Sequence, residues 1–307
     1  MRNKIIILCL LCVIAFPAIA QQYKAELPYR MIGGKMVVEM KLNGTLRSFI
    51  FDTGASRTTL TGEFCRELGL AVTDSLEVTD ANGRKSFYPL VRVDSIETPD
   101  NVFRFKSVAA MKMPEPSPLA CFPVDGLIGS DLFAQLVLVI DGEKKTVTIT
   151  TAEKESTVSL RKMTRFVQAK MPILSLQAGS GHNIVCLFDT GCPRFLSLKE
   201  SDFEALSSGS AYELLSEGTS VGAISVGGVS AERVSRRGNF PLLSVAGTKF
   251  RNVIAETATP PYTLLGVKLL DYGKVTIDYP RTRFYFEPYK PENDLAEKTH
   301  DVRLQVK

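Results

Sequence analysis

Apolar and polar positions alternate in short runs along most of the chain, which is the pattern of half-buried β-strands. Residues 35–42 and 47–51 are two such runs, and Asn43-Gly44 separates them. Asn-Gly between two apolar runs is a strong hairpin signal. The arrangement recurs where the runs MPILSLQ and NIVCLF flank a Gly-Ser-Gly turn. We therefore expect strands to dominate the fold.

Helical patterns are few and short. TGEFCRELGL begins with Thr61 as an N-cap and ends near Gly69, and SLKESDFEALSSG ends at Gly209. Further β pairs follow, and Asn82-Gly83 in LEVTDANGRKSFYPLVRV is a predicted hairpin tip. The fold class expected is mainly β with a few short helices.

The chain also repeats itself. Phe-Asp-Thr-Gly occurs at residues 51–54 and again at 188–191, an offset of 137 residues. Two further landmarks keep that offset: the tripeptides Leu127-Ile128-Gly129 and Leu264-Leu265-Gly266, and the strands that end at Asp141 and Asp278. Features in register without a net insertion indicate a duplicated half. We expect an N-terminal lobe at 21–150, a polar linker at 151–162, a C-terminal lobe at 163–290 and a charged tail at 291–307.

The start of the chain has the pattern of a secretory signal peptide. Arg2 and Lys4 precede an apolar run at 5–16, and Ala18-Ile19-Ala20 is a small-residue cleavage site. A retained membrane anchor is the alternative, but the apolar run is short for a span. We expect cleavage after about Ala20 and export to the periplasm or out of the cell, with no membrane span in the mature chain.

Composition argues against several classes of function. The formal net charge of +4 falls to about +2 without Arg2 and Lys4, so no basic footprint for nucleic acid is present. The two histidines, His182 and His300, lie in a turn and in the charged tail. A histidine metal site or a histidine-activated nucleophile is therefore disfavoured, and we expect no metal and no cofactor.

Four cysteines lie outside the predicted signal peptide: Cys65, Cys121, Cys186 and Cys192. Export would allow them to oxidise, but their spacing does not say which would pair. No C-x-x-C spacing remains among them, so a structural zinc site has little support.

The repeated aspartates carry the candidate chemistry. Asp52 and Asp189 each follow an apolar strand, and a pseudo-twofold axis would bring them face to face. Two touching carboxyls cannot both ionise comfortably, so the pair would share one proton. Such a pair offers a base to activate water and an acid to polarise a carbonyl. The alternative is that each aspartate caps a turn at a strand end.

The paired FDTG motifs, each followed 75 residues later by Leu-Ile-Gly or Leu-Leu-Gly, resemble those of the aspartic peptidases. The resemblance is closer to retropepsin-like exported bacterial members than to pepsin, and it covers roughly residues 30–287. It implies a bilobal acid-protease fold with a cleft between pseudo-twofold-related lobes. It also implies a β-hairpin flap over the cleft, for which Asn82 and Gly83 are the candidate tip and Gly218–Gly222 a less clear counterpart.

The same resemblance implies roles for individual residues. Asp52 and Asp189 would be the catalytic pair. The loops that support them would comprise Thr53, Gly54, Ala55, Thr190, Gly191 and Cys192.

The second motif departs from the usual pattern. It continues as Cys192-Pro193, and Pro193 has no N–H, so one backbone contact is lost. Cys192 could be a buried small residue or a redox switch. Ala55 and Cys192 are a non-donor and a weak donor beside the carboxyls, so we expect a pH optimum in the mildly acidic to neutral range.

The leading hypothesis is an exported, monomeric aspartic endopeptidase that acts on extended peptide or protein substrates. Two alternatives stay open, because fold alone does not establish function. One is a catalytically silent protein that binds peptides or another envelope component. The other is a structural two-lobed protein whose aspartates only cap turns.

Overall fold

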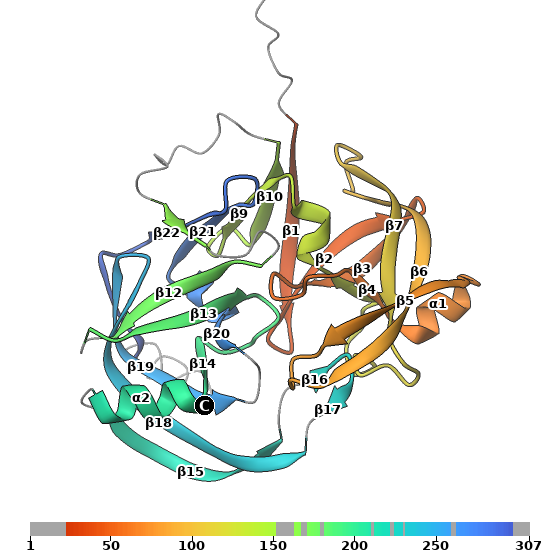
Figure 1. The fold of residues 1–307 in the computed structure, drawn as a ribbon. Coiled ribbons are helices and arrows are strands. Elements are labelled where there is room, and N and C mark those ends of the chain that lie inside the picture. The colour runs from red at the N-terminus through yellow and green to blue at the C-terminus, as the bar shows by residue number, and fades with distance from the viewer. Residues whose placement is uncertain are drawn as a thin grey trace, which may run out of the picture.

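A computed structural model gives the fold of the chain (Figure 1). It describes residues 23–151, 163–166, 171–178, 181–209, 212–221, 224–229, 231–258 and 262–296. The predicted signal peptide, nearly all of the predicted linker and the end of the predicted tail lie outside these residues. No helix in the described ranges is long and apolar enough to cross a membrane.

The elements of the N-terminal half follow in chain order. They are β1 (Lys24–Ile32), β2 (Lys35–Leu42), β3 (Thr45–Phe51), β4 (Thr59–Leu60), α1 (Gly62–Glu67), β5 (Val72–Thr79), β6 (Lys85–Glu97), β7 (Arg104–Lys112), β8 (Gly126–Ile128), the 3-10 helix η1 (Ser130–Phe133), β9 (Val137–Asp141) and β10 (Thr146–Thr150).

The C-terminal half has a similar order of elements. They are β11 (Thr164–Arg165), β12 (Ile173–Ala178), β13 (Asn183–Asp189), β14 (Leu196–Lys199), α2 (Glu200–Gly209), β15 (Glu213–Val221), β16 (Ile224–Ser225), β17 (Gly228–Val229), β18 (Glu232–Val245), β19 (Thr248–Ala258), β20 (Thr263–Gly266), the 3-10 helix η3 (Val267–Asp271), β21 (Gly273–Asp278), β22 (Arg283–Pro288) and β23 (Glu292–Asp294).

The predicted fold class, mainly β with short helices, is confirmed. Strands β2 and β3 form the predicted hairpin, and Asn43 and Gly44 at its tip both have positive φ. Thr61 caps helix α1 by accepting a hydrogen bond from Phe64 N, and Gly69 just beyond the helix has a φ of 63°.

The two halves are joined through a continuous sheet. In the described residues a 13-stranded sheet runs β11-β22-β21-β9-β10-β1-β2-β3-β8-β4-β7-β6-β5, and an 8-stranded sheet runs β15-β18-β12-β13-β20-β14-β19-β23. Strand β21 of the C-terminal half pairs with β9 of the N-terminal half, so that Ile277 lies opposite Leu138. Figure 1 shows β21 and β9 next to each other, with β10 between them and β1.

Two features lie outside the sequence-based expectations. Strand β1 precedes the first predicted strand and links β10 to β2. Part of the predicted charged tail, β23, pairs in parallel with β19, and Asn252 donates a side-chain hydrogen bond to Asp294.

Leu138 tests the shared sheet. It is fully buried on β9 and lies between Ile149 of β10 and Ile277 of β21, which are also fully buried. We expect Leu138→Ala to lower the free energy of unfolding by about 2–5 kcal/mol, because it leaves a cavity where the lobes join. Chemical denaturation measures this loss. Leu46→Ala, at a side chain that is 49% exposed, is the matched control and should cost far less.

Candidate active site

Each Asp-Thr-Gly loop is positioned by a pair of parallel strands. Strand β3 pairs with β8, and Asp52 N donates to Ile128 O at 3.0 Å. Strand β13 pairs with β20 in the same way, with Asp189 opposite Gly266. A Cβ on Gly266 would lie 2.1 Å from Arg194 O, so only glycine permits the backbone behind the second loop to come this close.

The two loops are held together by crossed threonine hydrogen bonds. Thr53 N donates to Thr190 Oγ1 at 3.0 Å, and Thr190 N donates to Thr53 Oγ1 at 3.1 Å. The hydroxyls then donate onward, Thr53 to Phe188 O at 2.8 Å and Thr190 to Phe51 O at 2.7 Å. Both threonines are buried, so each loop satisfies polar groups of the other.

This arrangement brings the two carboxyl groups together. A Cβ on Gly54 would lie 2.5 Å from Asp189 Cγ, and a Cβ on Gly191 would lie 2.5 Å from Asp52 Oδ2. Each glycine of one loop therefore makes room for the aspartate of the other. The Cβ built on Gly191 would also lie 3.0 Å from Asp189 Oδ1, so both carboxyls converge on the same point.

The environments of the two carboxyls differ. Asp52 Oδ1 accepts hydrogen bonds from Gly54 N at 3.0 Å and Ala55 N at 2.9 Å. Asp189 Oδ1 accepts one from Gly191 N at 2.7 Å. Burial, followed by the charge of Asp52, raises the pKa of Asp189 well above its ordinary value, and Lys35 opposes this rise. The raised pKa favours the protonated form of Asp189.

The residues that follow each motif lie at the base of the loops. Ala55 O accepts from Ser130 N at 2.8 Å, and Cys192 O accepts from Val267 N at 2.9 Å. The Cys192 thiol is buried 3.7 Å from Ser197 Oγ, and burial raises its pKa. A raised pKa disfavours the reactive thiolate, so the setting is that of a buried small residue.

Pro193 has a packing partner in the other lobe. A Cβ on Gly34, at the tip of the β1–β2 hairpin, would lie 2.8 Å from Pro193 Cβ. Next along the chain, Lys35 Nζ donates a hydrogen bond to Gly191 O. The departure from the usual motif is thus accommodated by contacts across the lobe interface.

The predicted tip residues Asn82 and Gly83 lie in the turn between β5 and β6, where Gly83 has a φ of 77°. Of the less clear counterpart, Gly218 lies within strand β15, and Gly222 lies outside the described residues. The described turn of this hairpin is at Val226 and Gly227, between β16 and β17. The sequence did not indicate this turn, because the strands on either side of it have only two residues each, and hydrophobic alternation does not identify strands that short.

The two hairpin tips are joined by polar contacts, which we call the tip latch: Asp80, Asn82, Arg84, Ser225 and Gly227. Ser225 Oγ donates to Asp80 Oδ2 at 2.9 Å, and Arg84 Nη2 donates to Gly227 O at 2.9 Å. Asn82 Nδ2 donates to Ser225 Oγ at 3.1 Å. Figure 1 shows β16 and β17 beside the β5–β6 hairpin.

Asp80 is the centre of the tip latch and is 3% exposed. Its burial opposes the charged form, but hydrogen bonds from Arg84 N, Ser225 and Asn82 N outweigh it and lower the pKa of Asp80. A lowered pKa means that this carboxylate stabilises the contact at neutral pH and loses that contribution as pH falls through its folded-state value.

An apolar cluster lies beside the first loop. Val226 of the second hairpin tip packs with Ala55, Phe122 and Val124 against a buried group that includes Leu119. The C-terminal hairpin therefore reaches over the N-terminal lobe next to Asp52.

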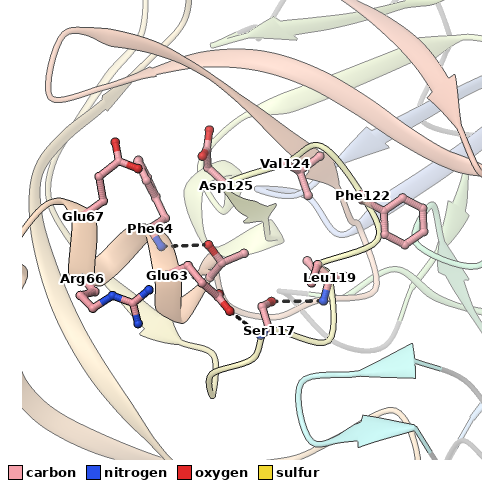
Figure 2. A pocket seen from close by; sticks show the side chains of 11 residues that line it. Glu63, Phe64, Arg66, Glu67, Ser117, Leu119, Phe122, Val124 and Asp125 are labelled. Atoms are coloured by element: carbon pink, nitrogen blue, oxygen red, sulfur yellow. Dashed lines mark hydrogen bonds between the residues drawn. The ribbon is translucent and has the colours of Figure 1, made fainter.

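A pocket of about 520 Å³ lies between helix α1 and the segment 117–125. Figure 2 shows the side chains that line it. Phe64 and Glu63 line it from the helix, and Leu119, Phe122 and Val124 line it from the segment. Ser117 N donates to Glu63 Oε1 at 2.8 Å across it. Neither aspartate of the pair is among its lining residues, so the pocket adjoins the apolar cluster rather than the reaction centre.

Several residues of the site were not expected from the sequence: Lys35, Asp80, Arg84, Ser225 and Gly227. The predicted Asn82-Gly83 turn lies between Asp80 and Arg84, so the sequence partly indicated these two residues. It did not indicate Lys35, Ser225 or Gly227, because their partners are distant in the chain.

Gly227 tests the tip latch. A Cβ there would lie 2.5 Å from Asp80 Oδ2 and 2.9 Å from the Tyr88 hydroxyl. We expect Gly227→Ala to separate the tips and to raise amide hydrogen exchange in residues 80–84 on the order of tenfold, as for a lost contact of about 1.4 kcal/mol. Gly218→Ala is the control, since nothing lies within 4 Å of a Cβ there. Unchanged exchange in Gly227→Ala would contradict the latch.

The comparisons agree with this geometry. Residues 38–132 match the family model described as aspartyl protease. A search of curated proteins found no match. The matched segment contains the first Asp-Thr-Gly loop, the β5–β6 hairpin and β8. The match supports the resemblance to aspartic peptidases over these residues of the N-terminal half.

Proposed function

We propose that this chain is an aspartic endopeptidase that hydrolyses peptide bonds with Asp52 and Asp189. One observation carries the proposal: two carboxyls from separate lobes converge within 3.0 Å of one point beside Gly191. Burial and the charge of Asp52 raise the pKa of Asp189. The family match supports peptidase activity in general.

The roles of the two aspartates follow from their surroundings. Asp52, whose Oδ1 accepts two backbone N–H groups, is the base that takes a proton from a water bound between the carboxyls. Asp189 holds the proton and donates it toward the carbonyl oxygen of the scissile bond. The water oxygen attacks the carbonyl carbon directly, so no covalent intermediate with the protein is needed.

The walls of the site suit an extended peptide. The apolar cluster includes Ala55 of the first loop and Val226 of the second hairpin tip, together with Phe122 and Val124. A substrate in strand conformation would bond to main-chain groups of these hairpins and place apolar side chains against the cluster. We also propose that the protein acts outside the cytoplasm, because the first residues have the pattern of a signal peptide. We propose that it acts as a monomer, because one chain carries both Asp-Thr-Gly loops.

A peptide library tests the reaction. We expect Asp52→Asn and Asp189→Asn each to lower kcat/KM by about 10²–10⁴-fold, because each removes half of the acid–base pair. Asp94→Asn, at an exposed position of β6, is the matched control. Pepstatin, a transition-state inhibitor, should block the wild type. Cleavage that survives both substitutions would refute the proposal, and peptide binding without any cleavage by the wild type would favour a silent binding protein.

The pH dependence is a separate prediction. The reactive form carries one proton on the pair, and the pKa of Asp189 is raised. Activity should therefore persist into the mildly acidic to neutral range and decline as pH rises through that raised pKa. On the acid side it should decline when the second carboxyl also takes a proton. A profile of kcat/KM with a maximum only below about pH 3 would contradict this assignment.

A further inference from the structure

Lys35 lies at the first position of β2, where the β1–β2 hairpin meets the second Asp-Thr-Gly loop. Its ammonium donates a hydrogen bond to Gly191 O, from one half of the chain to the other. The hairpin tip before it is tightly enclosed. A Cβ on Gly33 would lie 2.8 Å from Phe122 Cε1, and one on Gly34 would lie 2.8 Å from Pro193 Cβ. The tip therefore holds Lys35 in place.

The cation breaks the symmetry of the duplication. The position 137 residues after Lys35 is Pro172, which carries no charge. Pro172 O accepts a hydrogen bond from Phe188 N at 3.0 Å, a purely main-chain role. The pair of aspartates is thus flanked by a charged side chain at this position in the N-terminal half alone.

Lys35 is partly buried, and no described carboxylate forms an ion pair with it at contact distance. A partly buried ammonium needs a compensating charge. The aspartate pair with one proton carries one negative charge, and the charge of Lys35 acts on Asp189. The other ionisable groups facing the pair are Cys192 and Tyr279, whose pKa values are both raised, so neither supplies a charge at neutral pH.

We propose that Lys35 is a positioning residue that serves as the counter-ion of the Asp52–Asp189 pair and fixes the second loop through Gly191. The inference rests on the proposed function. It states that Lys35 sets the pH range over which the pair holds a single proton. The ammonium of Lys35 stabilises negative charge on the aspartate pair. Each of the two protons of the pair therefore dissociates at a lower pH than it would without this ammonium.

Lys35→Met removes the charge and retains a long side chain. We expect both limbs of the pH profile of kcat/KM to move upward by roughly one unit, the lower end of what a nearby opposite charge produces. Lys35→Arg keeps the charge and should keep the limbs near those of the wild type. Lys41→Met removes the same charge six residues further along β2, where the ammonium contacts Asn101, and should not move them.

A second measurement does not depend on activity. Carbon-13 labelling of aspartate carboxyls gives the titration of Asp189 directly, with its signal assigned by its loss in Asp189→Asn. If the titration midpoint of Asp189 moves to higher pH in Lys35→Met, the counter-ion role is supported, even if the wild type cleaves no peptide. Lack of cleavage by the wild type would refute only the proposed function. Lys35→Gln is a second neutral variant should Lys35→Met fail to fold, as checked by circular dichroism. An unshifted midpoint in a folded neutral variant, with or without lost activity, overturns the proposal.

Discussion

The site depends on the crossed hydrogen bonds between Thr53 and Thr190. Each hydroxyl accepts from the opposite backbone N–H and donates to a carbonyl one residue before the opposite aspartate. Four bonds in a buried setting leave each loop without an alternative position, because a buried donor without a partner costs about 1–3 kcal/mol. Two carboxyls that repel when both are ionised need such a frame to stay in contact, and the proposed sharing of a proton depends on that contact.

The pseudo-twofold symmetry of the two halves produces this frame. Departures from that symmetry give the two aspartates different neighbours. Ala55 N and Cys192 N each donate to the main-chain oxygen of the aspartate three residues before them, but Ala55 N also donates to Asp52 Oδ1, so Asp52 receives a second N–H at its carboxyl. Lys35 has Pro172 as its counterpart. A perfectly symmetric pair would have no preferred base and no preferred acid. The duplicated chain keeps the geometry that symmetry provides and uses unequal neighbours to place the proton on one side.

Local patterns predicted the elements around the loops. The β2–β3 hairpin, the Thr61 cap and the turn at Asn82-Gly83 each depend on residues close together in the chain, and turn and cap chemistry identifies them. The repeat predicted that the aspartates would meet. The pairing of β9 with β21, the second hairpin tip and the tip latch involve partners over a hundred residues apart. No local periodicity encodes such contacts, which explains why the roles of Lys35 and of Ser225, the distant partner of Asp80, were not predicted.

The tip latch and the aspartate pair use separate polar groups, and this separation bears on how a substrate could be enclosed. The latch consists of side chains and carbonyls at the hairpin tips, with Asp80 bonded to Ser225 and Arg84 to Gly227. The pair uses groups of the two Asp-Thr-Gly loops. Because no donor or acceptor is common to both sets, a peptide strand bonded to the loops need not displace the latch. Closure over a bound strand would then keep the latch contacts, so the energy of the latch would favour the enclosed state instead of opposing substrate binding.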